Sequence, residues 1–212
     1  SNRSFQDFFI FSSSILQFWI LFTSETITAE EMAKMQEIVI AKYDKTQSKF
    51  VDMATLTNNE TYDFNPRMTV INGVPVVVWL NNTDNNMLGT TNNNSIYYSK
   101  YENNAWTEPQ ALLSGSTAIT KMEMGILNNE VSISYIADTD NNLSTFEDRI
   151  LNVINLDKEN KQLVSDIGTS SYVEYTKYNN NDMLVWKKDD KIQGISNINT
   201  DIQDIYTSNS LL

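Results

Sequence analysis

An internal fourfold repeat constrains the fold of this chain more than any other feature of its sequence. Four aromatic residues, which we call the anchors, align without gaps: Trp19, Trp79, Tyr135 and Trp186. A turn-forming residue stands seven positions before each anchor: Ser12, Asn72, Asn128 and Asn179. Because Asn tolerates positive φ, Asn pairs between short apolar runs are typical of tight hairpin turns. The repeat therefore predicts four copies of a strand–turn–strand hairpin.

Two more strands follow each hairpin, separated by short polar turns. The predicted third strands are Ile38–Tyr43, Ile96–Tyr101, Ile150–Asn155 and Ile192–Asn197. The predicted fourth strands are Phe50–Leu56, Trp106–Leu113, Gln162–Ile167 and Ile202–Thr207. Four antiparallel strands per repeat make the blade of a β-propeller, which leaves only short sheet edges exposed.

We therefore predict an all-β chain that forms a β-propeller of four four-stranded antiparallel blades. The four blades either close into a ring or form an arc of a larger propeller, since about four blades is the lower limit of the class. The chain is expected to be a single propeller domain. Its predicted blades are residues 5–57, 62–114, 118–168 and 171–208.

Composition removes several classes of function. The chain has a net charge of −12, which repels nucleic-acid phosphates and anionic membrane surfaces. It contains no His and no Cys, so imidazole-dependent triads, thiolate catalysis, disulfides and Cys- or His-ligated zinc are excluded. We expect neither a nucleic-acid partner nor membrane insertion.

The N-terminal apolar run allows a second interpretation. Phe8–Phe22 is apolar enough for a signal-peptide core, with Thr26–Ala29 as its cleavage site. The run lies in phase with the other three hairpins, and Asp7 and Gln17 interrupt it, which favours propeller strands over a signal peptide or a membrane span. Thr28 and Glu31 form a capping-box pattern that predicts a short helix, 29–35.

A charged residue stands twelve positions before each anchor: Asp7, Arg67, Glu123 and Glu174. First strands line the axis of a propeller, so a common register would bring these four side chains to one level. Arg67 then either neutralises its acidic neighbours by ion pairing or orients a ligand beside two carboxylates that act as acid and base. Alternation along the strand could instead direct the charges between blades.

An aromatic cluster on the third and fourth strands of the second blade is the best candidate for an exposed binding surface: Tyr97, Tyr98, Tyr101 and Trp106. The anchors themselves are expected to pack between blades. The loops after the second strands are predicted to share one face with the connections between blades, and recognition is expected there. Arg67 completes the predicted ligand-binding set.

Two loops repeat the string Thr-Asp-Asn-Asn, at residues 83–86 and 139–142. Oxygen-rich loops of this kind suit Ca²⁺, so Asp84, Asp138 and Asp140 are candidate calcium ligands, with Glu147 and Asp148 nearby. Neither loop has the glycine and distal glutamate of a full EF-type loop. Solvated turns are the alternative, and no other cofactor is expected.

The segment from Ser99 to Trp106, followed by Glu108 and Pro109, resembles the Asp-box hairpin of sialidases and of many secreted bacterial propellers. Three expected residues are replaced, by Tyr101, Asn103 and Ala105. With Pro66–Trp79 and Ile96–Ser99, the phrase is also similar to repeats in surface proteins of low-GC Gram-positive bacteria. The resemblance implies an extracellular or cell-surface bacterial propeller. Sialidase catalysis is not expected, because that family requires an arginine triad and the chain has only Arg3, Arg67 and Arg149.

These features predict an extracellular binding module that recognises a glycan or a protein through loops on one propeller face. The first alternative is a glycoside-directed enzyme, or a part of one, that uses Glu123, Glu174 and Asp7 as axial carboxylates. The second alternative is a structural or assembly domain of a surface protein.

Overall fold

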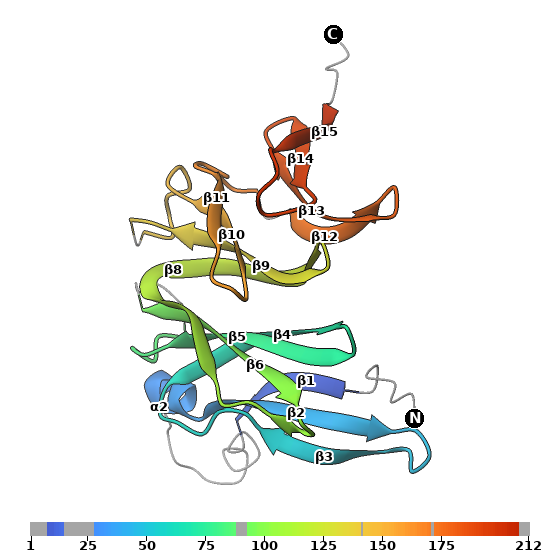
Figure 1. Cartoon of the computed structure of the whole chain (residues 1–212). Helices are drawn as coiled ribbons and strands as arrows, with labels where there is room; N and C mark the ends of the chain where they lie inside the picture. The colour runs from blue at the N-terminus through green and yellow to red at the C-terminus, as the bar shows by residue number, and fades with distance from the viewer. Residues whose placement is uncertain (1–7, 15–27, 88–92, 141, 171, 208–212) are drawn as a thin grey trace. The chain divides into compact units, whose positions relative to one another are not determined.

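The computed structural model describes residues 8–14, 28–87, 93–140, 142–170 and 172–207. This part of the chain consists of antiparallel strands and one short helix, as Figure 1 shows. The chain divides into two compact units, residues 1–116 and 117–212. Among the described residues, no helix is long and apolar enough to cross a membrane.

The first unit contains the sheets of blades 1 and 2. The strands of blade 1, in the order β1-β2-β3, are β1 (Phe8–Ser14), β2 (Gln36–Asp44) and β3 (Lys49–Thr55). The strands of blade 2 are β4 (Tyr62–Ile71), β5 (Val74–Asn82), β6 (Asn94–Glu102), the two-residue β7 (Ala105–Trp106) and the beginning of β8 (Gln110–Leu127). Neighbouring strands follow one another in sequence, which is the meander expected of a blade.

The second unit contains the sheets of blades 3 and 4. Blade 3 consists of the second part of β8, β9 (Glu130–Asp138), β10 (Ile150–Asn155) and β11 (Asn160–Val164). Blade 4 consists of β12 (Val173–Tyr178), β13 (Asn181–Lys188), β14 (Lys191–Ile195) and β15 (Gln203–Thr207). β8 is a single strand of 18 residues that supplies the last strand of blade 2 and the first strand of blade 3.

The asparagine pairs form the tight turns that the repeat predicts. Both residues have positive φ in each of the three hairpin turns between first and second strands: Asn72 with Gly73, Asn128 with Asn129, and Asn179 with Asn180. Two successive positive φ values define the type I′ turn, whose twist matches that of the flanking strands. The predicted hairpins of blades 2, 3 and 4 are confirmed.

The predicted turn at Ser12 is wrong. Ser12 lies inside β1, which pairs with β2 over its whole length, from Phe8 opposite Lys42 to Ser14 opposite Gln36. Ser adopts positive φ less readily than Asn and Gly, so a serine run is a weaker signal for a type I′ turn than an Asn pair. β1 therefore corresponds to a second strand of a blade, and the anchor Trp19 lies outside the described residues.

The predicted helix is present as α2 (Ala29–Lys34). Thr28 is its N-cap, and the capping box is complete: Thr28 Oγ1 accepts a hydrogen bond from Glu31 N at 3.1 Å, and Glu31 Oε2 accepts one from Thr28 N at 2.8 Å. These two bonds satisfy backbone donors that the first helical turn leaves free.

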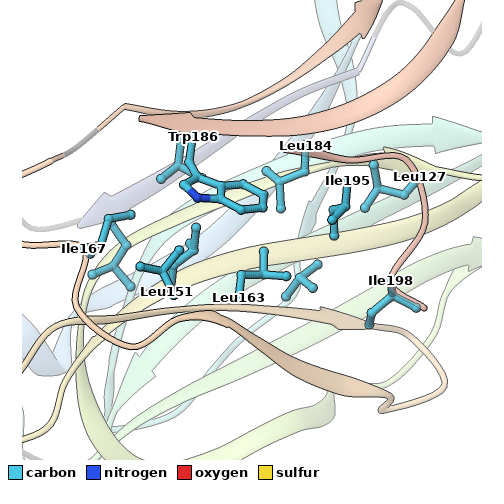
Figure 2. Packing of buried hydrophobic residues seen from close by; sticks show 12 residues of the cluster. Leu127, Leu151, Leu163, Ile167, Leu184, Trp186, Ile195 and Ile198 are labelled. Atoms are coloured by element: carbon cyan, nitrogen blue, oxygen red, sulfur yellow. The ribbon is translucent and has the colours of Figure 1, made fainter. Parts of the chain in front are cut away.

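Each unit has a hydrophobic core of its own. In the first unit, Ile38 and Ile40 of β2 pack with Val77 and Trp79 of β5. In the second unit, twelve buried residues from blades 3 and 4 form one cluster around Trp186, which Figure 2 shows from close by. The anchors Trp79, Tyr135 and Trp186 are all buried. Trp79 packs against residues of blade 1 and Trp186 against residues of blade 3, as predicted for the anchors.

Two first strands approach closely within the second unit. Gly125 of β8 faces the ring of Tyr175 of β12, and a Cβ atom on Gly125 would lie 2.1 Å from Tyr175 Cγ. The hydroxyl of Tyr175 accepts a hydrogen bond from Ser132 Oγ at 2.9 Å. Burial raises the pKa of this phenol above its usual value, which keeps it neutral.

Candidate functional site

A pocket with a volume of about 1150 Å³ lies within the first unit, and we call it the unit 1 pocket. Its lining comes from β3 and the segment after it, from β4, β5 and β6, and from the residues around β7. The aromatic side chains in the lining are Trp79, Tyr97, Tyr101 and Trp106. The amide and hydroxyl side chains are Thr55, Thr57, Asn58, Asn59, Thr61, Asn81, Thr83, Asn104 and Thr107.

The aromatic residues of the unit 1 pocket form two pairs. The rings of Trp79 and Tyr97 stack, with centroids 6.0 Å apart and planes at 22°. Tyr101 and Trp106 meet edge to face, with centroids 5.4 Å apart. Trp79 is buried, whereas the other three are only partly buried, so each of these three keeps some of its surface available to a ligand.

A short hairpin holds Trp106 beside the pocket. Its turn is formed by Asn103 and Asn104, both with positive φ. Ser99 Oγ donates to the carbonyl oxygen of Thr107 at 2.7 Å, and Thr107 N donates to the carbonyl oxygen of Lys100 at 2.9 Å. This is the segment that resembles an Asp-box, and its bonds fix the pocket edge from Asn104 onwards.

The polar centre of the pocket is Asp63, which is only 1% exposed. Its Oδ1 accepts hydrogen bonds from Trp79 Nε1 at 3.0 Å and Asn81 Nδ2 at 2.9 Å, and its Oδ2 accepts one from Asn59 Nδ2 at 2.9 Å. Burial raises the pKa of Asp63 above its usual value, while these hydrogen bonds act in the opposite direction. The carboxylate therefore orients the indole and two amides that line the pocket.

Asp63 was not singled out by the sequence analysis. It belongs to no motif, and the chain has 27 acidic residues. One signal was available: a buried Trp needs an acceptor for its indole N–H, and Trp79 is the anchor of its blade. The sequence does not say which acidic side chain reaches that nitrogen, because the pairing depends on strand register.

The structure brings together three of the five predicted ligand-binding residues. Tyr97, Tyr101 and Trp106 line the unit 1 pocket. Tyr98 is buried, and its hydroxyl donates to Gln110 Oε1 at 2.7 Å. Arg67 is half-buried on β4 and donates to the carbonyl oxygen of Pro66 at 3.2 Å. Neither Tyr98 nor Arg67 lines the pocket.

The charged residues of the first strands share one register. Arg67 lies opposite Val78, Glu123 opposite Ser134 and Glu174 opposite Val185, so each pairs with the residue before an anchor. Glu123 is partly buried, 3.9 Å from Lys121 Nζ, whereas Glu174 is exposed. Arg67 belongs to the first unit and the two glutamates to the second, and Asp7 lies outside the described residues. The axial ring therefore stays a prediction.

The predicted calcium ligands separate into two places. Asp138 and Asp140 lie together in the second unit and are joined by Asp148, with one carboxylate oxygen from each within 4.8 Å of the others. Asp84 belongs to the first unit, where its Oδ2 accepts a hydrogen bond from Asn93 Nδ2 at 2.6 Å. Among the described residues, the acidic group close enough together to share one metal ion is the one in the second unit.

Solved structures with a similar fold are propeller glycoside hydrolases. The α-L-arabinanase of Penicillium chrysogenum, in complex with arabinobiose, matches 80% of this chain at 12% identity with a TM-score of 0.51. A mutant α-L-arabinofuranosidase of Fusarium graminearum, in complex with an iminosugar inhibitor, matches 80% at 16% identity with a TM-score of 0.52. The chain has the β-propeller fold.

This propeller chain spans about half the length of those two structures, 54% and 55% respectively. No protein-family model matches its sequence, and no curated protein does. The similarity to these two structures is therefore a similarity of fold.

Proposed function

We propose that the chain is a carbohydrate-directed propeller and that the unit 1 pocket is its glycan site. The observation that carries this proposal is one pocket in which three partly exposed aromatic rings stand beside many amide and hydroxyl groups. Sugar rings present apolar faces for aromatic contact and a rim of hydroxyls for hydrogen bonds. Pockets of this kind combine apolar surface with a few fixed polar groups.

The charges of the pocket favour a neutral glycan. Its charged lining residues are Lys42, Asp63 and Glu108, and Asp63 already accepts three hydrogen bonds from neighbouring side chains. The chain carries a net charge of −12, which repels acidic polysaccharides. The arabinose-directed activity named for both similar structures makes arabino-oligosaccharides the first sugars to test.

A role in glycoside hydrolysis is the version of this proposal that we favour over a binding module. Both similar structures are named as glycoside-cleaving enzymes. Glycosidases use two carboxyl groups in unlike surroundings, one as acid and one as base or nucleophile. Glu123 and Glu174 stand in equivalent register on the first strands of blades 3 and 4, one partly buried and one exposed. Because both belong to the second unit, their role in cleavage is tested separately from binding at the unit 1 pocket. The resemblance of the Ser99–Trp106 hairpin to those of secreted bacterial propellers supports an extracellular location.

Binding is tested by titrating the chain with arabino-oligosaccharides and with a panel of neutral glycans, using calorimetry. We expect Tyr101→Ala to weaken binding about tenfold, since an aromatic contact contributes roughly 1 kcal/mol beyond its buried area. The matched control is Tyr206→Ala, which removes an exposed tyrosine of the second unit. Equal affinity of the Tyr101→Ala variant and the parent chain would contradict the assignment of the pocket.

Hydrolysis is tested by the release of reducing sugar from the glycan that binds. If the enzymatic version holds, Glu123→Gln and Glu174→Gln each reduce release at least 100-fold, within the range usual for loss of an acid or base, while calorimetric binding persists. Binding at the unit 1 pocket with no hydrolysis by the parent chain would leave the binding module as the function.

A further inference from the structure

We propose that the segment between β9 and β10 forms a Ca²⁺ site, with Asp138, Asp140 and Asp148 as its carboxylate ligands. This site lies in the second unit and does not depend on the glycan proposal. One carboxylate oxygen from each residue lies within 4.8 Å of the corresponding oxygens of the other two. Ca²⁺ binds oxygen at about 2.4 Å, so ligands on opposite sides of the ion are about 4.8 Å apart. The three carboxylate oxygens are therefore close enough together to bind one Ca²⁺ ion.

Two residues of the cluster have a buried carboxylate oxygen without a hydrogen-bond partner, which points to a ligand. Asp138 is 0% exposed, and its Oδ1 atom has no hydrogen-bond partner among the described residues. The same holds for Asp148 Oδ1, which is also buried. A buried carboxylate oxygen without a partner is costly, so such atoms are normally paired or coordinate a metal. An oxygen-binding cation satisfies both at once.

The charges of the cluster favour a divalent cation. Arg149 pairs with Asp138, and its Nε lies 3.4 Å from Asp138 Oδ2. Its guanidinium is held in addition by the carbonyl oxygen of Leu143 at 3.1 Å and by the ring of Phe146. Three carboxylates and one guanidinium leave a local charge of about −2, and the neighbouring carboxylate of Glu147 makes it more negative; a divalent ion offsets most of this charge.

The corresponding segment of blade 2 provides an internal comparison. Asn82 stands three residues after the anchor Trp79, as Asp138 does after Tyr135. Asn82 Nδ2 donates to Asn94 Oδ1 at 2.7 Å, and its Oδ1 accepts from the backbone N–H groups of Asp84 and Asn86. The amide of Asn82 therefore closes the blade 2 turn with hydrogen bonds. In the described part of blade 3, the backbone N–H groups of Asp140 and Asn142 donate instead to Asp148 Oδ2 and Asp140 Oδ1, and Asp138 Oδ1 has no partner.

The backbone of blade 3 already orients the other two ligands. Asp148 Oδ2 accepts hydrogen bonds from the backbone N–H groups of Thr139 and Asp140, both at 2.8 Å. Asp140 Oδ1 accepts one from Asn142 N at 2.7 Å. Because these bonds hold the carboxylates of Asp140 and Asp148 in place, binding an ion requires little further ordering of them.

The test is a titration of the chelator-treated chain with CaCl₂, followed by calorimetry and by thermal unfolding. We expect one Ca²⁺ to bind per chain and the midpoint temperature of unfolding to rise, because an ion that binds only the folded state stabilises that state. Asp138→Asn, which copies the residue of blade 2, should weaken Ca²⁺ binding at least tenfold. The matched control is Asp84→Asn, which changes the corresponding loop of blade 2 and should leave the Ca²⁺ response intact.

Circular dichroism of the ion-free proteins shows whether Asp138→Asn retains the fold. If that variant does not fold, Asp148→Asn replaces it, with the same expected tenfold loss. The proposal is overturned if millimolar CaCl₂ produces neither heat of binding nor a shift in the midpoint. It is equally overturned if the folded variants bind Ca²⁺ as the parent chain does, or if MgCl₂ and NaCl at equal ionic strength give the same shift as CaCl₂.

Discussion

Single polar side chains close the turns of this chain, and Asp44 shows how one of them does so. Its Oδ1 accepts hydrogen bonds from Thr46 Oγ1 at 2.5 Å, Thr46 N at 2.8 Å and Gln47 N at 3.1 Å, and its Oδ2 accepts one from Gln47 Nε2 at 2.8 Å. These bonds favour the ionised carboxylate and lower the pKa of Asp44 to about 2. The turn between β2 and β3 therefore depends on the charge of one aspartate.

Acid should remove this contribution. The folded pKa of Asp44 lies below its usual value of 3.8, so its contribution is fully present above that value and is lost as the pH falls towards 2. We expect Asp44→Ala to be less stable than the parent chain at pH 6, with most of that difference gone near pH 2. Chemical denaturation at both pH values measures the difference. A gap that stays constant down to pH 2 would show that the carboxylate charge is not responsible.

The packing of two strands in the second unit depends on a position where an aromatic ring lies directly against the backbone. Gly125 of β8 and Tyr175 of β12 form such a position in the second unit. The flat ring occupies the space that a side chain at residue 125 would need, and its hydroxyl bonds to Ser132 across the strands. Gly125 is thus required by packing, since it does not have the positive φ that marks Gly73 and Gly168.

Gly125→Ala should destabilise the second unit by about 2 kcal/mol, the usual cost of forcing extra volume into a packed core. Urea denaturation measures this change. A double-mutant cycle identifies the cause: in the Tyr175→Ala background the ring is gone, and the same glycine substitution should cost much less. Equal costs in both backgrounds would rule out the ring as the source of the clash.

The repeat in the sequence predicts these elements well, because their signals are local. The turns at Asn72, Asn128 and Asn179 follow from one property of one residue type, the tolerance of positive φ. The capping box at Thr28 is equally local. The turn at Ser12 was misplaced because the repeat alignment counted serine as equivalent to asparagine, although the two differ in that same property.

The candidate site is less predictable from the sequence. Tyr101 and Trp106 were found because they sit together on one hairpin. The other wall of the unit 1 pocket comes from the segment after β3, and Asp63 reaches it from β4. Their approach depends on how two sheets pack, which no local pattern records. The meeting of Asp138 and Asp148 likewise depends on the path of the chain between β9 and β10.

Over its full length, the chain combines two compact units, each with a core of its own, and a strong excess of negative charge. Each core consists of residues from its own unit. Acidic residues outnumber basic ones by 27 to 15. Like charges at this density repel one another in the folded state and oppose compaction.

Monovalent salt should therefore stabilise the chain. Raising NaCl from about 10 mM to about 150 mM shortens the screening length from roughly 30 Å to roughly 8 Å, which weakens long-range repulsion more than it weakens close ion pairs such as Lys191 with Asp204 at 2.6 Å. We expect the midpoint of thermal unfolding to rise over this range. Scanning calorimetry in buffers that contain a chelator measures the rise without interference from calcium. A midpoint that falls with salt would indicate that ion pairs outweigh repulsion.

The residue three positions after the anchor is an asparagine in blade 2, Asn82, and an aspartate in blade 3, Asp138. Asn82 closes its turn with three hydrogen bonds, whereas Asp138 Oδ1 has no hydrogen-bond partner among the described residues. If Asp138 takes part in calcium binding as we propose, the stability of blade 3 follows the calcium concentration of the surroundings, whereas that of blade 2 does not. The exchange of an amide for a carboxylate at a single position thus makes one copy of a repeated module responsive to its environment.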